Sequence, residues 1–206
     1  MNTITSGPIL IATGNPGKLE ELRTLLGTIG IPVISLDDIS AVPAFPEEGE
    51  SYEENAVGKA VHYSRHTDHL TLADDSGLEV DCLGGIPGVR SARFGGEEAG
   101  SAEKCRKILS LLAGVPAARR GAGFRCVLAL ARKGELIRVF RGTCRGRIAT
   151  QPSGEKGFGF DPVFFYPLAG KTFAELAPDE KHRFSHRGRA LRSLLTYLKK
   201  EWGQEN

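Results

Sequence analysis

The chain has 206 residues, which is enough for one sizeable α/β domain or for two lobes, and a core of that size needs no disulfide or metal staple. Its 40% hydrophobic and 25% charged residues match a globular protein, and no apolar run approaches the roughly 18 residues of a membrane-spanning helix. With 27 Lys and Arg residues against 25 Asp and Glu residues, the net charge of +2 does not favour a nucleic-acid partner.

The first half of the chain alternates strands and helices in its hydrophobic pattern. Apolar runs predict strands at residues 8–12, 33–36 and 71–73, and the last of these continues in extended form over 78–80. Apolar residues at helical spacing predict a helix from residue 19 to residue 29, ended by Gly30, and Ser51 with Glu54 predicts a second helix that opens with a capping box. The proline-containing segment 39–50 has no periodicity and is predicted to be a loop.

The second half of the chain contains an antiparallel pair of strands. A glycine-rich loop at 84–96 and a helix over 101–112 precede an alternating strand at 124–130, a turn at 132–135 and a returning strand at 136–141. After a glycine-rich, aromatic loop at 154–161, Ser185 is predicted to begin the last helix. The buried face of that helix is predicted to consist of Leu191, Leu194, Leu195, Leu198 and Trp202. The antiparallel pair breaks a simple βαβ pattern and indicates a second lobe.

The four cysteines form no CxxC pair and have no zinc-like His spacing, which is typical of reduced thiols in a cytosolic protein. Residues 1–8 lack a basic region followed by an apolar stretch, so no signal peptide is expected. Together these features predict a cytoplasmic protein without a membrane partner.

The first candidate for chemistry is a glycine-rich turn that joins the first strand to the first helix. It reads Thr13-Gly14-Asn15-Pro16-Gly17-Lys18. Backbone N–H groups at a helix N-terminus bind phosphate, and a nearby lysine adds positive charge. The turn is not a Walker A motif. The alternative is an ordinary βα turn with an exposed lysine.

The second candidate is the acidic pair Asp74 and Asp75, followed by Ser76, at the predicted end of a strand. Carboxylates are the ligands that magnesium prefers in proteins. Because successive strand residues point to opposite faces, the two acids are expected to do different jobs, with only one of them reaching a ligand. The alternative is a local Asx turn.

Two further signals depend on the tertiary fold. The acidic loop from Glu47 to Glu50 is solvated unless the fold brings it to Asp75, and Lys59, one helical turn beyond Asn55, is a surface residue unless other groups lie beside it.

Two segments near the C-terminus have the composition of a nucleoside site. Phe158, Gly159, Phe160 and Asp161 place aromatic rings between glycines, and such rings can stack on a base. The alternative is a turn whose rings join the core, although the glycines make this less expected for at least one ring. Lys181, Ser185, His186 and Arg187 gather positive charge at the predicted start of the last helix, where they suit an anion or a base edge. The alternative there is a helix capped by Ser185.

Taken in order, six blocks resemble the inosine triphosphate pyrophosphatase family, also called XTP/dITP diphosphatase or Ham1-like. The resemblance covers residues 9–198, and the blocks are ATGNPGK, ENAxxKA at 54–60, ADDSGLEVD, LGGIPGVRSARF, FGFDP and SHRG. It implies an α/β fold with an elongated mixed sheet, flanking helices and two lobes around a central nucleotide cleft. It also implies a single pyrophosphatase domain over 1–206 and a homodimer.

The resemblance also implies roles for the candidate residues. Thr13, Asn15 and Lys18 with the rest of their turn, together with Lys59 and Ser76, correspond to triphosphate-binding positions. Asp75 corresponds to the general base and magnesium ligand. The segment from Phe158 to Asp161 corresponds to the nucleoside-binding segment, and Lys181, His186 and Arg187 to the base-recognition end. The chain departs from the family in two places: many bacterial members have Tyr at Phe160, and the shorter acidic loop makes Glu47 the choice for second metal ligand, with Glu48 close behind.

The implied activity is magnesium-dependent hydrolysis of ITP, dITP and XTP to the monophosphate and pyrophosphate. Donors near His186 and Arg187 would meet the 6-carbonyl of these bases but not the 6-amino group of adenine. The alternatives are a pyrophosphatase for other modified nucleotides, a nucleotide sensor without catalysis, and nucleic-acid binding through Arg119, Arg120 and the basic last helix.

Overall fold

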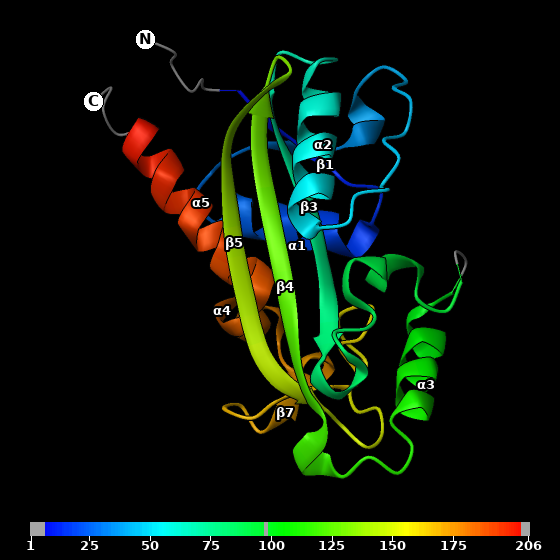
Figure 1. Ribbon diagram of the computed structural model, residues 1–206. Helices are drawn as coiled ribbons and strands as arrows, with labels where there is room; N and C mark the ends of the chain where they lie inside the picture. Colours follow the sequence, from blue (N-terminus) through cyan, green and yellow to red (C-terminus); the bar gives the residue numbers. More distant parts are fainter. Residues whose placement is uncertain (1–6, 97–98, 203–206) are drawn as a thin grey trace. The chain divides into compact units, whose positions relative to one another are not determined.

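The computed structural model describes residues 7–96 and 99–202, of Trp202 the backbone alone. Its strands are β1 Ile9–Ala12, β2 Val33–Ile34, β3 Leu70–Val80, β4 Gly121–Arg132, β5 Glu135–Ile148, β6 Phe164–Tyr166 and β7 Lys171–Thr172. Its α-helices are α1 Pro16–Gly27, α2 Tyr52–Ser64, α3 Ser101–Leu111, α4 Pro178–Phe184 and α5 His186–Trp202. In the described residues the strands form one sheet in the order β2-β1-β3-β4-β5-β6-β7 (Figure 1). None of the helices within these ranges is both long and apolar enough to cross a membrane.

Contacts along the chain define two compact units. The first unit contains residues 7–75, 126–142 and 187–202, and the second contains 76–96, 99–125 and 143–186. Strands β3, β4 and β5 each continue from one unit into the other. That residues 1–206 act as one pyrophosphatase domain with a central cleft stays a prediction.

The first unit has a parallel core. Strand β1 pairs with both β2 and β3 in parallel, and all four of its residues are buried, as expected of a strand covered on both faces. Helix α1 packs on this core through Leu22 and Leu26, which are one helical turn apart and buried. Helix α5 adds Leu191, Leu194 and Leu198 to the same apolar cluster.

The second unit has an antiparallel, aromatic core. Ile148 on β5 pairs with Phe164 on β6, and β6 pairs in turn with β7. The rings of Phe124, Phe164 and Phe173 lie within 6 Å of one another, and helix α3 adds Cys105 and Ile108 to the same cluster. Parallel pairing in one part of the sheet and antiparallel pairing in the other confirm the predicted α/β class with a mixed sheet.

The predicted hairpin turn is confirmed. Lys133 and Gly134 join β4 to β5, and both have positive φ angles of 51° and 83°. Two central residues with positive φ form a type I′ turn, and its twist matches that of the flanking strands. The returning strand is longer than predicted and extends to Ile148.

Several predicted boundaries were wrong. Strand β3 is continuous, so Asp74 and Asp75 lie in its middle. They form neither the predicted strand end nor the alternative Asx turn. Strand β2 has only two residues, and a 3-10 helix begins at Leu36. Another 3-10 helix, Gly88–Arg93, lies inside the predicted glycine-rich loop.

Helix α4 was not predicted, and Lys181 lies in it rather than at the start of the last helix. The helix has only seven residues, too few to show a hydrophobic period. A local signal was present, because Pro178 occupies the first helical turn and the Glu180 carboxylate accepts a hydrogen bond from the Ala177 N–H at 3.1 Å. The last helix, α5, begins at His186, directly after Ser185.

Candidate active site

The turn after β1 is held by its own side chains. Asn15 caps α1, because its Oδ1 accepts a hydrogen bond from the Lys18 N–H at 3.1 Å, and Pro16 occupies the first helical turn. The Thr13 hydroxyl accepts from the Asn15 N–H at 3.2 Å. Both contacts fix the N-terminus of α1, where the helix dipole favours an anion.

Lys18 is buried, so the alternative of an exposed lysine in an ordinary turn is wrong. Its Nζ lies 2.8 Å from Asp74 Oδ1 and 3.9 Å from Asp75 Oδ1. Burial lowers the pKa of this ammonium, but the two carboxylates outweigh burial and raise the pKa above its ordinary value. Lys18 therefore keeps its positive charge inside the unit.

Lys59 is also buried, contrary to the expectation for a single helical lysine. Its Nζ donates to the backbone oxygen of Asp74 at 3.1 Å and lies 2.9 Å from Glu47 Oε1. The Lys18 ammonium donates to the same Asp74 backbone oxygen at 3.4 Å. One carbonyl on β3 thus holds two ammonium groups from α1 and α2 side by side.

Asp74 is the buried anion that organises this charge. It has no exposed surface. Its carboxylate lies 2.8 Å from both Arg187 Nε and Lys18 Nζ and accepts a hydrogen bond from the Cys126 thiol at 3.3 Å. Burial raises the pKa of its carboxyl, but Arg187 and Lys18 reverse this and hold the pKa well below its usual range. Asp74 is therefore ionised and used entirely in internal contacts.

Asp75 points to the opposite face of β3 and has a different environment. Its Oδ2 accepts a hydrogen bond from Asn55 Nδ2 at 3.1 Å, and its side chain is 6% exposed. Burial raises the pKa of this carboxyl, and the lowering effects of Lys18 and Lys59 do not cancel the rise. The prediction that the two acids differ in function is consistent with these environments, because Asp75 keeps the higher proton affinity that suits a general base.

Asn55 brings the acidic loop to Asp75. Besides donating to Asp75, it accepts a hydrogen bond from the Gly49 N–H at 2.8 Å through Oδ1. The loop also contributes Glu47 to the Lys59 ammonium, whereas the neighbouring Glu48 is exposed. The sequence alone could not show this approach, since the contacts join residues from a loop, a helix and a strand.

The donor set suits a magnesium ion. Within residues 7–96 and 99–202, no group of three or more His, Cys, Asp and Glu side chains could hold a metal. Magnesium does not require such a group, because it is usually bound by one or two carboxylates together with water and substrate phosphates. Asn55 bonds both Asp75 and the Gly49 N–H of the acidic loop, and the same loop places Glu47 beside Lys59. The chemistry of the two carboxylates, Asp75 and Glu47, therefore fits the ion that the resemblance implies.

Arg187 lies in this first unit, where its guanidinium group pairs with carboxylates. Its side chain is 1% exposed, and its guanidinium group contacts Asp74 and Glu21. Burial lowers the pKa of Arg187, but the two carboxylates raise it well above its ordinary value. The base-recognition role predicted for Arg187 together with Lys181 and His186 stays a prediction.

The second unit holds the predicted nucleoside segment around Asp161. This buried carboxylate lies 2.5 Å from Lys181 Nζ and accepts a hydrogen bond from the Phe158 N–H at 2.9 Å. Gly157 has a φ of +75°, and a Cβ there would lie 2.1 Å from Asp161 Oδ2. Only glycine therefore allows the loop to fold back onto the carboxylate.

The two phenylalanines of this segment have different environments. Phe160 is buried in the aromatic core, where its ring centroid lies 5.9 Å from that of Phe94. The Phe158 ring is half-buried, with Lys181 Nζ 5.0 Å from its centroid. Gly159 between them donates its N–H to the Ser101 hydroxyl at 2.8 Å. One ring joins the core and one stays partly accessible, as the glycine spacing predicted.

His186 is buried against the aromatic core of the second unit. Its ring stacks on Phe124 with a centroid separation of 4.6 Å and an interplanar angle of 11°.

Ser76, another predicted phosphate contact, follows Asp75 on β3 and is half-buried.

The alternative of nucleic-acid binding loses one of its residues. Arg120 is buried and donates to the backbone oxygens of Leu112, Val115 and Ala149 at 2.8 to 3.0 Å. Its charge is used to hold the backbone of the second unit together.

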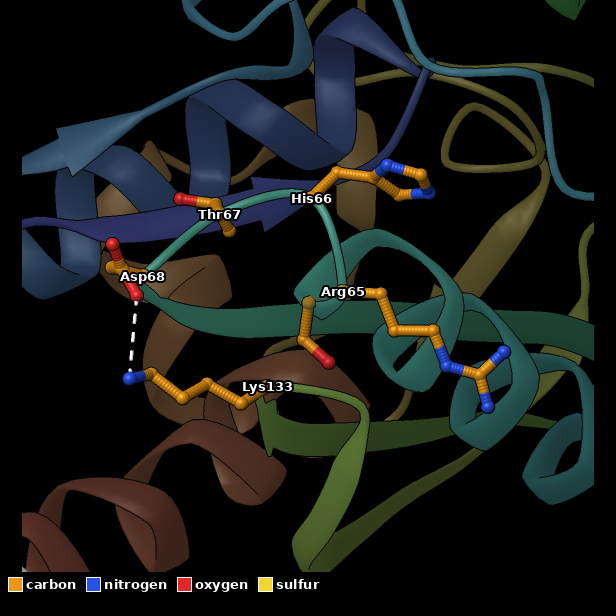
Figure 2. A pocket seen from close by; sticks show the side chains of 6 residues that line it. Arg65, His66, Thr67, Asp68 and Lys133 are labelled. Carbon is orange, nitrogen blue, oxygen red and sulfur yellow. Dashed lines mark ion pairs between the residues drawn. The ribbon is translucent and has the colours of Figure 1, made fainter.

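A pocket of about 510 Å³ lies at the end of α2 in the first unit. Figure 2 shows Lys133 reaching toward Asp68, with their charged groups 3.4 Å apart. The lining residues are Ser64, Arg65, His66, Thr67, Asp68 and Lys133. None of them is a predicted site residue, so this surface pocket is separate from the cluster formed by Lys18, Lys59, Asp74 and Asp75.

The first unit places buried lysines beside a helix N-terminus and next to a carboxylate of raised pKa. This arrangement is that of an anion-binding α/β protein. A model of the Ham1 family matches residues 9–197. The chain is 48% identical over 194 residues to the dITP/XTP pyrophosphatase of Geobacillus kaustophilus, covering 94% of this chain and 93% of that protein. It is 47% identical over 193 residues to that of Yersinia pseudotuberculosis, covering 93% and 98%.

Solved structures agree with these relatives. A HAM1 protein from Coxiella burnetii matches with a TM-score of 0.83 and 40% identity, covering 94% of this chain and 99% of that one. The chain belongs to the Ham1 family.

Proposed function

We propose that this protein hydrolyses non-canonical purine nucleoside triphosphates, ITP, dITP and XTP, to the monophosphate and pyrophosphate. The observation that carries the proposal is the convergence of Lys18 and Lys59 on one backbone oxygen, directly before Asp75. The two dITP/XTP pyrophosphatases that align over nearly the whole chain support it. Such an activity removes damaged nucleotides from the pool.

The two lysines and the α1 N-terminus would bind the triphosphate. Both ammonium groups are buried and held in position before any ligand arrives. Charges that are already oriented in a water-poor site stabilise developing negative charge strongly, because they need not reorganise during the reaction. Asp74 would act as a positioning residue because it pairs with Lys18, and Arg187 would support it by pairing with Asp74 in turn.

Asp75 would orient and deprotonate the attacking water. Its raised pKa gives it a greater proton affinity than an ordinary aspartate, and Asn55 fixes one of its oxygens. Asp75 and Glu47 would hold the magnesium, whose chemistry is to neutralise the charge on phosphate oxygens.

Residues of the second unit would bind the base. The Phe158 ring has Lys181 beside it, so we assign base stacking to its other face. A donor from Lys181 or His186 would meet the 6-carbonyl of hypoxanthine and xanthine, whereas adenine would present an amino group. A buried site that depends on such a bond rejects the wrong partner by up to about 10⁴–10⁵-fold.

Pyrophosphate release from ITP, dITP, XTP, ATP and GTP, with and without magnesium, tests the proposal. We expect magnesium-dependent release from the first three alone. Because guanine also carries a 6-carbonyl, rejection of GTP requires a further contact that excludes its 2-amino group. Release from all five would contradict the base selectivity and keep the chemistry. Nucleotide binding without release would favour a sensor. Modified pyrimidine nucleotides added to the panel test the remaining alternative, because release from them would favour a different pyrophosphatase.

Replacing Phe158 with alanine should raise KM for ITP and lower kcat/KM by about 5- to 150-fold, because base stacking contributes about 1–3 kcal/mol. Steady-state kinetics with ITP and XTP measure the effect. Phe165→Ala is the matched control, since this half-buried ring also has a cation beside it, Arg147 at 4.5 Å. Equal losses in the two variants would remove Phe158 from the base site.

Four further features stay predictions of the proposal. The protein is expected to be cytoplasmic and to bind neither nucleic acid nor membranes. It is also expected to be a homodimer, which sedimentation velocity can test. Heparin retention that falls steeply with salt would contradict the expectation about nucleic acid.

A further inference from the structure

We infer that the contact between Phe45 and Gly58 positions Glu47 and thereby sets the magnesium affinity of the site. The inference rests on the proposed function, because Glu47 is the second proposed metal ligand. Phe45 and Gly58 are positioning residues that touch neither substrate nor metal.

Glu47 lies in a segment without regular secondary structure. A 3-10 helix ends at Asp38, and residues 39–50 after it contain neither helix nor strand. The Glu47 carboxylate nevertheless lies 2.9 Å from the buried Lys59 ammonium. Holding a loop in one conformation costs conformational entropy for every residue that is fixed. Contacts elsewhere in the loop must therefore offset that cost if the carboxylate is to stay in place.

The first attachment lies two residues before Glu47. A Cβ added at Gly58 on α2 would lie 2.3 Å from Phe45 Cζ and about 3 Å from both Cε atoms. The Phe45 ring thus occupies the space that any side chain at position 58 would need. The Phe45 N–H donates to the Tyr63 hydroxyl at 3.3 Å, and His62 Nε2 lies 2.8 Å from the Pro43 backbone oxygen.

The second attachment lies two residues after Glu47. The Gly49 N–H donates to Asn55 Oδ1 at 2.8 Å, and a Cβ at Gly49 would lie 2.6 Å from that same oxygen. Glu47 is therefore bracketed by two close approaches of the loop to α2, each of which depends on a glycine. The Asn55 attachment also contacts Asp75, so only the Phe45 attachment can be altered without touching the proposed catalytic groups.

Gly58→Ala tests the inference, because alanine is the better helix former while its methyl group must displace the Phe45 ring. We expect the magnesium concentration for half-maximal ITP hydrolysis to rise about 10-fold, the lower end of the range for residues that orient metal ligands, with kcat at saturating magnesium nearly unchanged. Mn²⁺ binding in the presence of pyrophosphate, followed by the electron paramagnetic resonance signal of free Mn²⁺, should weaken by a similar factor.

Two comparisons separate positioning from a general effect of the substitution. Gly27→Ala, at the end of α1, is the matched control, since a Cβ there meets nothing within 4 Å. Phe45→Ala should weaken magnesium activation as Gly58→Ala does, and the double variant Phe45→Ala/Gly58→Ala should be no worse than Phe45→Ala, because the ring that clashes is gone.

An unchanged magnesium dependence and unchanged Mn²⁺ binding in Gly58→Ala would overturn the inference. So would an effect of Gly58→Ala that is equally large when Phe45 is already alanine. Failure of the proposed function would look different, because the wild-type protein itself would then show no magnesium-dependent pyrophosphate release.

Discussion

Replacing Asp75 with asparagine should lower kcat for ITP by about 10²–10⁴-fold, the range that general-base catalysis contributes. The amide has the shape of the carboxylate and can still accept the hydrogen bond from Asn55, so the local structure should be kept. It cannot accept a proton from water, which is the function assigned to Asp75.

The same variant should not lose stability. The folded-state pKa of Asp75 is raised above its ordinary value, so the folded protein holds the ionised carboxylate less favourably than the unfolded chain does. At neutral pH, removing that charge should leave the free energy of unfolding unchanged or slightly higher. Urea denaturation and steady-state kinetics on one preparation measure both quantities.

The control for Asp75 is Asp68→Asn, which changes an exposed carboxylate on the same unit whose partner is the exposed Lys133. We expect no change in its kcat, since surface ion pairs contribute about 0–1 kcal/mol to stability and Asp68 is absent from the proposed site. A near-normal kcat in Asp75→Asn would remove the role of general base from this residue.

Replacing the neighbouring Asp74 with asparagine should destabilise the fold, unlike Asp75→Asn. We expect a loss of about 3–5 kcal/mol in the free energy of unfolding. Asp74 is fully buried and neutralises Arg187 and Lys18, both of which are buried as well. Without its charge, two cations remain in the interior with reduced compensation. Urea denaturation at neutral pH measures the loss, with Asp81→Asn as the control because its ion pair with Arg145 is exposed.

The pH dependence of stability should report the same group. The folded pKa of Asp74 lies well below its unfolded value of about 3.9, so its stabilising contribution is present above that value. The contribution is lost as the pH falls through the folded pKa. We therefore expect wild-type stability to fall more steeply below about pH 4 than that of Asp74→Asn. Parallel curves for the two proteins would show that Asp74 is not the buried anion that stabilises the unit.

Local features of the chain were predictable from sequence because they depend on neighbouring residues. The turn and helix after the first strand were predicted, although α1 begins at Pro16 rather than at residue 19, because Asn15 and Pro16 are residue types that cap and start a helix. The hairpin turn follows from Lys133-Gly134 between two alternating strands. The different environments of Asp74 and Asp75 follow from the alternation of side chains along a strand.

The tertiary structure alone decided which charges are buried and which groups they meet. Lys18, Lys59 and Arg187 are residue types that usually face solvent, and their burial requires carboxylates or carbonyls from other elements. The sequence by itself therefore determined most of the elements, though not α4, and the candidate residues, whereas long-range packing decided that Glu47 pairs with Lys59 and that Arg187 pairs with Asp74. The reason is that the cost of removing a charge from water is offset only by partners distant along the chain, and no local pattern specifies them.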